Sequence, residues 1–118
     1  MAQMSARQLL LELEAILPQA ILKVKRIPNH NHSAETFYGG DEPPNITLDE
    51  YKTGLIRGAV HECLHIYMSD WIREKFDANL DEIIIAALEE YLCKKRVMTA
   101  AMANRWRRII EQARQEDN

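Results

Sequence analysis

The sequence has few of the residues that mark several classes of protein. Only two of its 118 residues are cysteines, Cys63 and Cys93, and both stand among apolar residues. The sequence therefore does not suggest a disulfide scaffold, and a reducing compartment, the cytoplasm, is expected. The longest apolar runs, LLL at 9–11 and IIIAAL at 83–88, fall far short of the ~20 residues that span a membrane. The residues after Met1 lack the basic flank and apolar stretch of a signal peptide, so we expect neither a leader nor a membrane partner.

The overall composition is that of an ordinary globular chain. Hydrophobic residues make up 47% and charged residues 28%, and the length suffices for one hydrophobic core, so residues 1–118 are expected to form a single domain. The charges are distributed unevenly within the net charge of -3. Residues 41–90 contain twelve acidic and four basic side chains, whereas residues 91–118 contain three acidic and seven basic ones. An acidic middle suits a cation site and a basic tail suits an anionic partner, although solvated helix surfaces look the same.

The first half of the chain predicts one helix and a small sheet. Ser5 can cap a helix that runs to about Leu17, where Pro18 ends it. ILKVKRI at 21–27 alternates apolar and basic residues, as a half-exposed strand does. Two further short strands are expected, TFYGG at 36–40 and NITL at 45–48.

The second half predicts three helices. Asp49 is placed to cap a helix from Glu50 to about Ser69, and a loop or loose helical turn is expected after it. Asn79 or Asp81 then opens a helix to about Val97, and residues 99–115 form the last one. The predicted fold is therefore a small α+β domain, with an N-terminal helix and two or three strands followed by three helices.

The central helix carries the motif HECLH at 61–65. On a helix, His61 and His65 differ by about 40° around the axis, so both imidazoles leave one face one turn apart. That spacing suits two nitrogen ligands of a tetrahedral zinc ion. Glu62 points about 100° away from His61, which suits a general base beside the metal better than a ligand.

The surroundings of the motif favour a metal site over chance. Apart from the motif itself, residues 58–68 are uncharged, and Gly54 and Gly58 fall within about 60° of His61 on the helical wheel. Two glycines on one helix face suggest that room is kept for a close approach. The alternative is a pair of histidines that are hydrogen bonded within the core.

The run from Gly58 to Tyr67 resembles the active-site helix of zincin metallopeptidases. The chain is similar to minimal gluzincin-type and phage or prophage metallopeptidase-like proteins, and the resemblance covers about residues 45–93. It implies that Zn²⁺ is the cofactor, that His61 and His65 are ligands, and that Glu62 is the catalytic residue that activates water. It also implies a third, downstream carboxylate ligand and a peptide or protein substrate.

Several candidates for the third ligand can be set aside. A metzincin would have glycine and histidine where this chain has Met68 and Trp71, so that subclass is excluded. His30 and His32 lie upstream in a polar connector and would give an unusual ligand order.

Two glutamates of the next helix remain. Glu82, Ala86, Glu89 and Cys93 form a stripe about 60° wide, and the spacing from His65 allows either glutamate to be the ligand. The resemblance favours Glu82, because DEIII is similar to the opening of the ligand helix in that family. Glu89 would then accept a hydrogen bond from a histidine N–H. A carboxylate near a helix N-terminus, like that of Glu82, is also favoured without any metal.

The expected activity is hydrolysis of peptide bonds by a zinc metalloendopeptidase. Three protein ligands leave the fourth zinc position open to water, whose proton Glu62 would take. The oxyanion donor is left open among four residues: His32, Tyr38, Tyr67 and Tyr91. An extended peptide could pair with the edge of TFYGG or NITLD.

Two other functions are considered. A catalytically silent zinc-containing binding or regulatory module would need the histidines but not Glu62. A nucleic-acid-binding protein would use NRWRRII, where three arginines surround Trp106. Trp106, Ile109, Ile110 and Ala113 are more simply explained as the buried face of the last helix, with the arginines directed outward.

Overall fold

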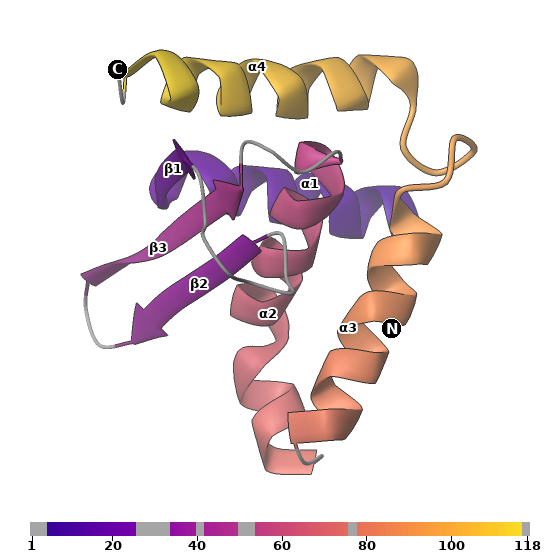
Figure 1. Cartoon of the computed structure of the whole chain (residues 1–118). Coiled ribbons are helices and arrows are strands. Elements are labelled where there is room, and N and C mark those ends of the chain that lie inside the picture. Colours follow the sequence, from indigo (N-terminus) through magenta and orange to yellow (C-terminus); the bar gives the residue numbers. More distant parts are fainter. Residues whose placement is uncertain (1–4, 26–33, 40–41, 50–53, 76–77, 117–118) are drawn as a thin grey trace.

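Four helices pack with a three-stranded sheet that lies at one side of the molecule in a computed structural model of the chain, which describes residues 5–25, 34–39, 42–49, 54–75 and 78–116 (Figure 1). The elements in chain order are α1 (Ala6–Ile16), the 3-10 turn η1 (Leu17–Gln19), β1 (Ile21–Lys25), β2 (Ala34–Gly39), β3 (Glu42–Asp49), α2 (Leu55–Lys75), α3 (Ala78–Leu92) and α4 (Ala100–Glu116). The predicted α+β fold, with the sheet in the first half, is confirmed.

The predicted cap of α1 is present. The Ser5 hydroxyl accepts a hydrogen bond from the Gln8 N–H at 3.1 Å, and the Gln8 side chain accepts one from the Ser5 N–H at 2.8 Å. This capping box satisfies two of the amide groups that a helix start leaves without partners. Pro18 follows within η1, because proline cannot continue the hydrogen bonding of an α-helix.

The strand order is β1-β3-β2, with β3 parallel to β1 and antiparallel to β2. Val24, Ile46 and Leu48 are buried, and the alternating positions of β1 are exposed. One face of the sheet therefore lies against the helices. NITLD belongs to the central strand, so the expectation that it could offer a free edge is wrong.

The motif helix α2 is the centre of the packing. It contacts α1, α3, α4 and the strands β2 and β3. Its buried side chains include Ala59, Val60, Cys63 and Leu64, which join one cluster with apolar residues of α1, the sheet, α3 and α4. A helix held on several sides is a rigid support for functional side chains.

The ends of α2 and α3 differ from the predictions. Asp49 is not a helix cap: it ends β3 opposite Lys25. Residues 50–53, expected at the start of α2, lie outside the described residues. Gly54 has φ +79°, which a helix cannot accommodate, and its carbonyl accepts the first helical hydrogen bond, from Gly58 N–H. The helix continues to Lys75 instead of Ser69, and α3 ends at Leu92 instead of Val97.

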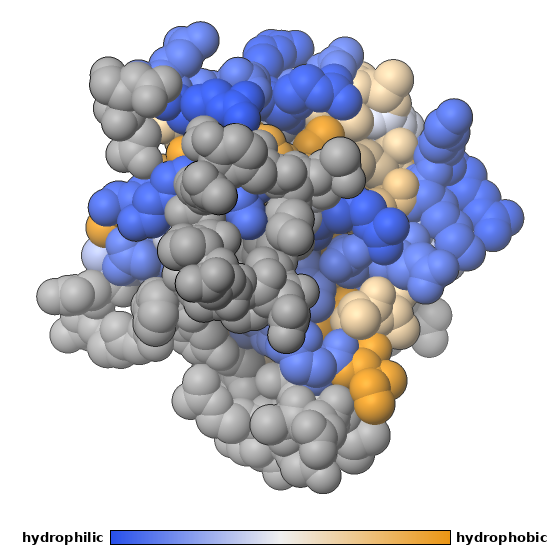
Figure 2. Space-filling view, viewed as in Figure 1, coloured by the Kyte–Doolittle hydropathy of each residue, from blue (hydrophilic) through white to orange (hydrophobic). Residues whose placement is uncertain are grey.

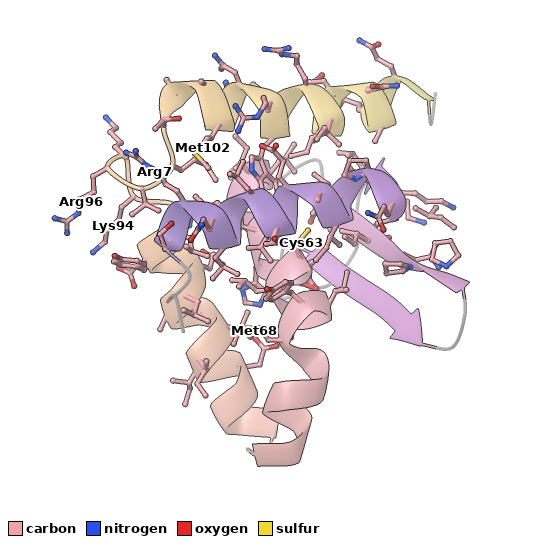
Figure 3. All side chains as sticks on the ribbon, turned by 180° about the vertical axis from the view of Figure 1, so that it is seen from behind. Arg7, Cys63, Met68, Lys94, Arg96 and Met102 are labelled. Carbon is pink, nitrogen blue, oxygen red and sulfur yellow. The ribbon has the colours of Figure 1, made fainter. Side chains whose placement is uncertain are left out.

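Arg7 of α1 holds the turn between α3 and α4. Its guanidinium donates to the carbonyls of Arg96 and Val97, at 3.1 and 3.4 Å, and Figure 3 shows it beside the turn that carries Lys94 and Arg96. Cys63 lies in the interior in the same view.

None of the helices in the described ranges combines the length and apolar content needed to cross a membrane.

Candidate metal centre

His61 and His65 face the same direction from consecutive turns of α2. Their Nε2 atoms are 3.2 Å apart, and their ring centroids are 4.9 Å apart. The side chains are only 20% and 15% exposed. The histidine pair is therefore held within the protein, as the motif spacing predicts.

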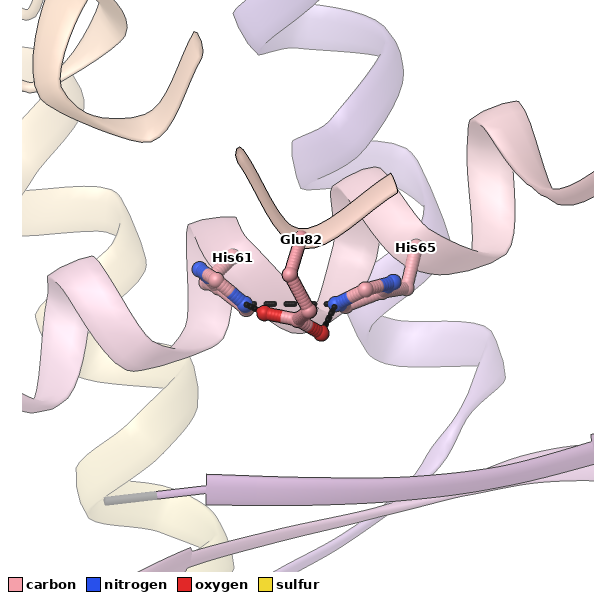
Figure 4. Close-up of side chains that lie close together, drawn as sticks. All are labelled: His61, His65 and Glu82. Carbon is pink, nitrogen blue, oxygen red and sulfur yellow. Dashed lines mark hydrogen bonds and ion pairs between the residues drawn. The ribbon is translucent and has the colours of Figure 1, made fainter. Parts of the chain in front are cut away.

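Glu82 completes the group from the first half of α3, and its carboxylate lies between the two imidazole rings (Figure 4). One oxygen, Oε1, is 2.9 Å from His65 Nε2, and the other, Oε2, is 3.4 Å from His61 Nε2. The ligand atoms of the three residues all lie within 4.8 Å of one another. The Glu82 side chain is 62% exposed, so the group is open to solvent on the side of α3.

The three side chains fit a zinc ion in chemistry and spacing. Zinc at about 2.0–2.1 Å from each ligand in a tetrahedron requires ligand atoms roughly 3.3 Å apart. The two nitrogens are 3.2 Å apart, and each lies near a different oxygen of the carboxylate, His65 at 2.9 Å from Oε1 and His61 at 3.4 Å from Oε2. Two imidazoles and one carboxylate also form the donor set of a common type of catalytic zinc site with an open fourth position.

Glu89 fixes the orientation of the His61 ring. Its Oε1 lies 2.9 Å from His61 Nδ1, while Arg57 donates a hydrogen bond to its Oε2 from Nε at 2.7 Å and forms an ion pair with the same oxygen from Nη2 at 2.6 Å. A carboxylate paired with arginine accepts hydrogen bonds and donates none, so Nδ1 must carry the proton. In the neutral ring the lone pair is then on Nε2, which faces His65 and Glu82.

This arrangement brings the Nε2 atoms of two imidazoles and one carboxylate together. The lone pair of His61 Nε2 faces a Glu82 oxygen at 3.4 Å, and His65 Nε2 is close to both. Acceptors repel one another at such distances unless a proton or a cation lies between them. A proton on His65 Nε2 meets this need when no metal is bound, and the same three groups are placed so that they could hold a metal ion.

Glu62 lies outside the converging group, as expected for a residue that is not a ligand. It is 6% exposed, follows His61 directly, and interacts with neighbouring groups. Burial of a carboxylate is costly unless it is engaged by polar groups. Its charge is felt locally: burial, and then the Glu62 carboxylate, raise the pKa of the Cys63 thiol to about 12.

The structure narrows the candidates for the oxyanion donor. Tyr67 leaves α2 roughly 160° from His65, and Tyr91 leaves α3 about 180° from Glu82; both side chains are exposed, by 42% and 49%. These directions argue against either tyrosine. The side chain of Tyr38 and all of His32 lie outside the described residues, as does His30.

Arg57 is a residue of the site that was not predicted from the sequence. It precedes His61 by four residues and so occupies the same face of α2. That spacing was visible in the sequence. Its partner was not, because the contact with Glu89 depends on how α2 packs against α3.

The basic helix α4 is used largely for packing. Trp106 is fully buried, and Ile110 is nearly so. Arg105 donates to both oxygens of Glu14 at 3.1 Å, and Arg114 pairs with Glu111. A buried indole cannot stack on a base, which favours the predicted core role of Trp106.

Comparisons with known proteins leave the site without an assignment. No family model, curated protein or solved structure matches the chain. A function therefore has to be inferred from the residues of the site themselves.

Proposed function

We propose that this protein is a zinc-dependent metallopeptidase in which His61, His65 and Glu82 hold the ion. The observation that carries the proposal is the convergence of two imidazole nitrogens and a carboxylate at 2.9 to 3.4 Å. Two nitrogen ligands with one oxygen suit zinc better than calcium or magnesium, which prefer oxygen ligands.

Glu62 is the proposed general base. Zinc in this site would supply a Lewis acid that polarises the peptide carbonyl and makes water acidic enough to attack near neutral pH. A carboxylate oxygen of Glu62 would take the proton of the attacking water and later give it to the leaving amine. A glutamate directly after the first histidine is otherwise unnecessary in a zinc-binding module, which is why hydrolysis is preferred over that alternative.

An extended, unstructured peptide is the proposed substrate. In the described part of the sheet, β2 is an edge strand and contacts α2, the helix of the motif, so a peptide could add to that edge by backbone pairing. Apolar surface lies over α3 in Figure 2. Ile83 of α3 follows Glu82 and is 63% exposed. Such surface would suit apolar side chains of a substrate.

A reducing, cytoplasmic setting is also proposed. Cys63 and Cys93 are free thiols. Burial, and then the Glu89 charge, raise the pKa of the Cys93 thiol to about 11, against an opposing effect of Arg57. Protonated, partly buried thiols are poor disulfide formers, which agrees with cysteines used for packing.

Cleavage of unstructured peptides would test the proposal. A mixture of peptides is incubated with the zinc-loaded protein, with the Glu62→Gln variant and with a Glu90→Gln control, and new termini are identified by mass spectrometry. We expect cleavage by the wild type and the control, and a loss of about 100-fold or more with Glu62→Gln, as general acid–base catalysis contributes 10²–10⁴-fold. Zinc binding without cleavage would instead support the silent binding module. Equal cleavage by Glu62→Gln would contradict the mechanism.

A further inference from the structure

A chain of three charged or polar side chains runs from the surface to the candidate metal centre. Arg57 donates to Glu89, and Glu89 accepts from His61 on the side of its ring opposite to Glu82. Arg57 and His61 come from α2, whereas Glu89 comes from α3. The chain therefore joins the two helices that supply the ligands.

The two oxygens of Glu89 are divided between the partners. Arg57 contacts Oε2 with both Nε and Nη2, whereas His61 Nδ1 is hydrogen bonded to Oε1. Two nitrogens of one guanidinium, which is a rigid, planar fork, hold Oε2 in place, and the contact of Oε1 with His61 then sets the direction of the carboxylate. Oε1 is then left facing the ring of His61.

We infer that Arg57 is a positioning residue of the metal centre, acting through Glu89 on His61. The inference rests on the proposed function and adds to it a residue that never touches the metal. By holding Glu89, Arg57 keeps the proton on Nδ1 and the lone pair of Nε2 directed at the ligand group. Partners beyond the ligands typically change metal affinity by about 10–100-fold.

The expected effect lies in affinity rather than in folding. The Arg57 side chain is 54% exposed and the Glu89 side chain is 17% exposed, and an ion pair whose cation is open to solvent contributes little to stability. Loss of the guanidinium should therefore leave the protein folded while Glu89 and His61 gain freedom. We expect zinc affinity to fall about tenfold, at the lower end of that range, because Arg57 is one residue further from the metal than Glu89.

Arg107 offers a matched control. It lies with Arg57 in the wall of a pocket of about 350 Å³ between the first turn of α2 and α4. Its Nη1 donates to Asn104 Oδ1 at 2.8 Å. Arg57→Met and Arg107→Met thus remove the same charge from the same pocket, but only the first removes a donor to Glu89.

The first measurement is zinc affinity in a double-mutant cycle. Competition with a chelator is used for the wild type, Arg57→Met, Glu89→Gln, the double variant and Arg107→Met. We expect weaker binding in Arg57→Met, no change in Arg107→Met, and little further loss when Arg57→Met is added to Glu89→Gln, since both act through one contact. Arg57→Lys should restore part of the affinity, because it returns the charge without the fork. Wild-type affinity in Arg57→Met, or additive losses in the double variant, would overturn the inference.

The second measurement needs no metal. Long-range ¹H–¹⁵N NMR spectra of the metal-free protein, at a pH where the imidazoles are neutral, report which ring nitrogen of His61 is protonated. We expect a signal of the Nδ1–H form in the wild type and in Arg107→Met, and a mixture of both forms in Arg57→Met. Identical His61 signals in all three would contradict the inference. A wild type that shows the Nδ1–H form but takes up no zinc would refute the proposed function and leave the positioning by Arg57 supported.

Discussion

Replacing Glu82 by glutamine removes one of the three proposed metal ligands while leaving the side chain's shape nearly unchanged. In the metal-free protein the effect on stability should be small, because Glu82 is 62% exposed and exposed pairs of this kind are worth about 0–1 kcal/mol. In the presence of zinc the effect should be large. The variant therefore separates the role of Glu82 in metal binding from any role in folding.

The size of the effect follows from the linkage between binding and folding. At free zinc 100 times the dissociation constant, wild-type protein gains about 2.7 kcal/mol in its free energy of unfolding. Loss of a ligand should weaken binding by at least ~100-fold, the upper end of the range for outer partners. At the same zinc concentration the variant then gains only about 0.4 kcal/mol. For a chain of 118 residues, the difference corresponds to roughly 9 °C in melting temperature, at about 4 °C per kcal/mol.

Thermal melts followed by circular dichroism, with and without zinc, would measure this difference. Glu90→Gln is the control, because it removes an exposed carboxylate from the same helix without touching the histidines. We expect the control to keep the wild-type response to zinc. A full zinc-dependent shift in Glu82→Gln, or an equal loss in Glu90→Gln, would refute the assignment of the third ligand.

Two further predictions concern the interior. The pKa of the buried Cys63 thiol is raised from an ordinary value of about 9 to about 12, so between these values the unfolded chain has lost a proton that the folded chain keeps. The free energy of unfolding of the metal-free protein should therefore fall by about 1.4 kcal/mol per pH unit from this group as the pH rises. Urea titrations at several pH values should show that this free energy falls less steeply with pH in Cys63→Ala. Equal pH dependence in the two proteins would contradict the raised pKa. Trp106 is fully buried, so Trp106→Ala should cost about 3–5 kcal/mol in urea unfolding, while the exposed Arg108→Ala should cost under ~0.5 kcal/mol. A mild effect of Trp106→Ala would contradict its place in the core.

The helices and their faces could be predicted because they depend on local periodicity. The capping residue Ser5 and the shared face of His61 and His65 follow from spacing alone, and both are present in the structure. The start of α2 was predicted wrongly, because Asp49 resembles a helix cap but is taken up by pairing between β3 and β1. Strand pairing joins distant segments, so no local pattern reveals it.

The choice between Glu82 and Glu89 could not be made from spacing. Both lie on one stripe of α3, and their roles depend on where that stripe crosses α2. The structure brings Glu82 against the Nε2 atoms and Glu89 against Nδ1 of His61. The hydrogen bond expected from a histidine to Glu89 is therefore present, and metal binding by Glu82 stays a prediction.

The zinc content of the purified protein tests the central claim most directly. Elemental analysis is applied to the wild type, His61→Ala and Glu62→Gln after exposure to excess zinc and removal of the unbound ion. The proposed site predicts one equivalent of zinc in the wild type, one in Glu62→Gln, since Glu62 is not a ligand, and none in His61→Ala. A wild-type protein that takes up no zinc, or a His61→Ala variant that keeps it, would contradict the account.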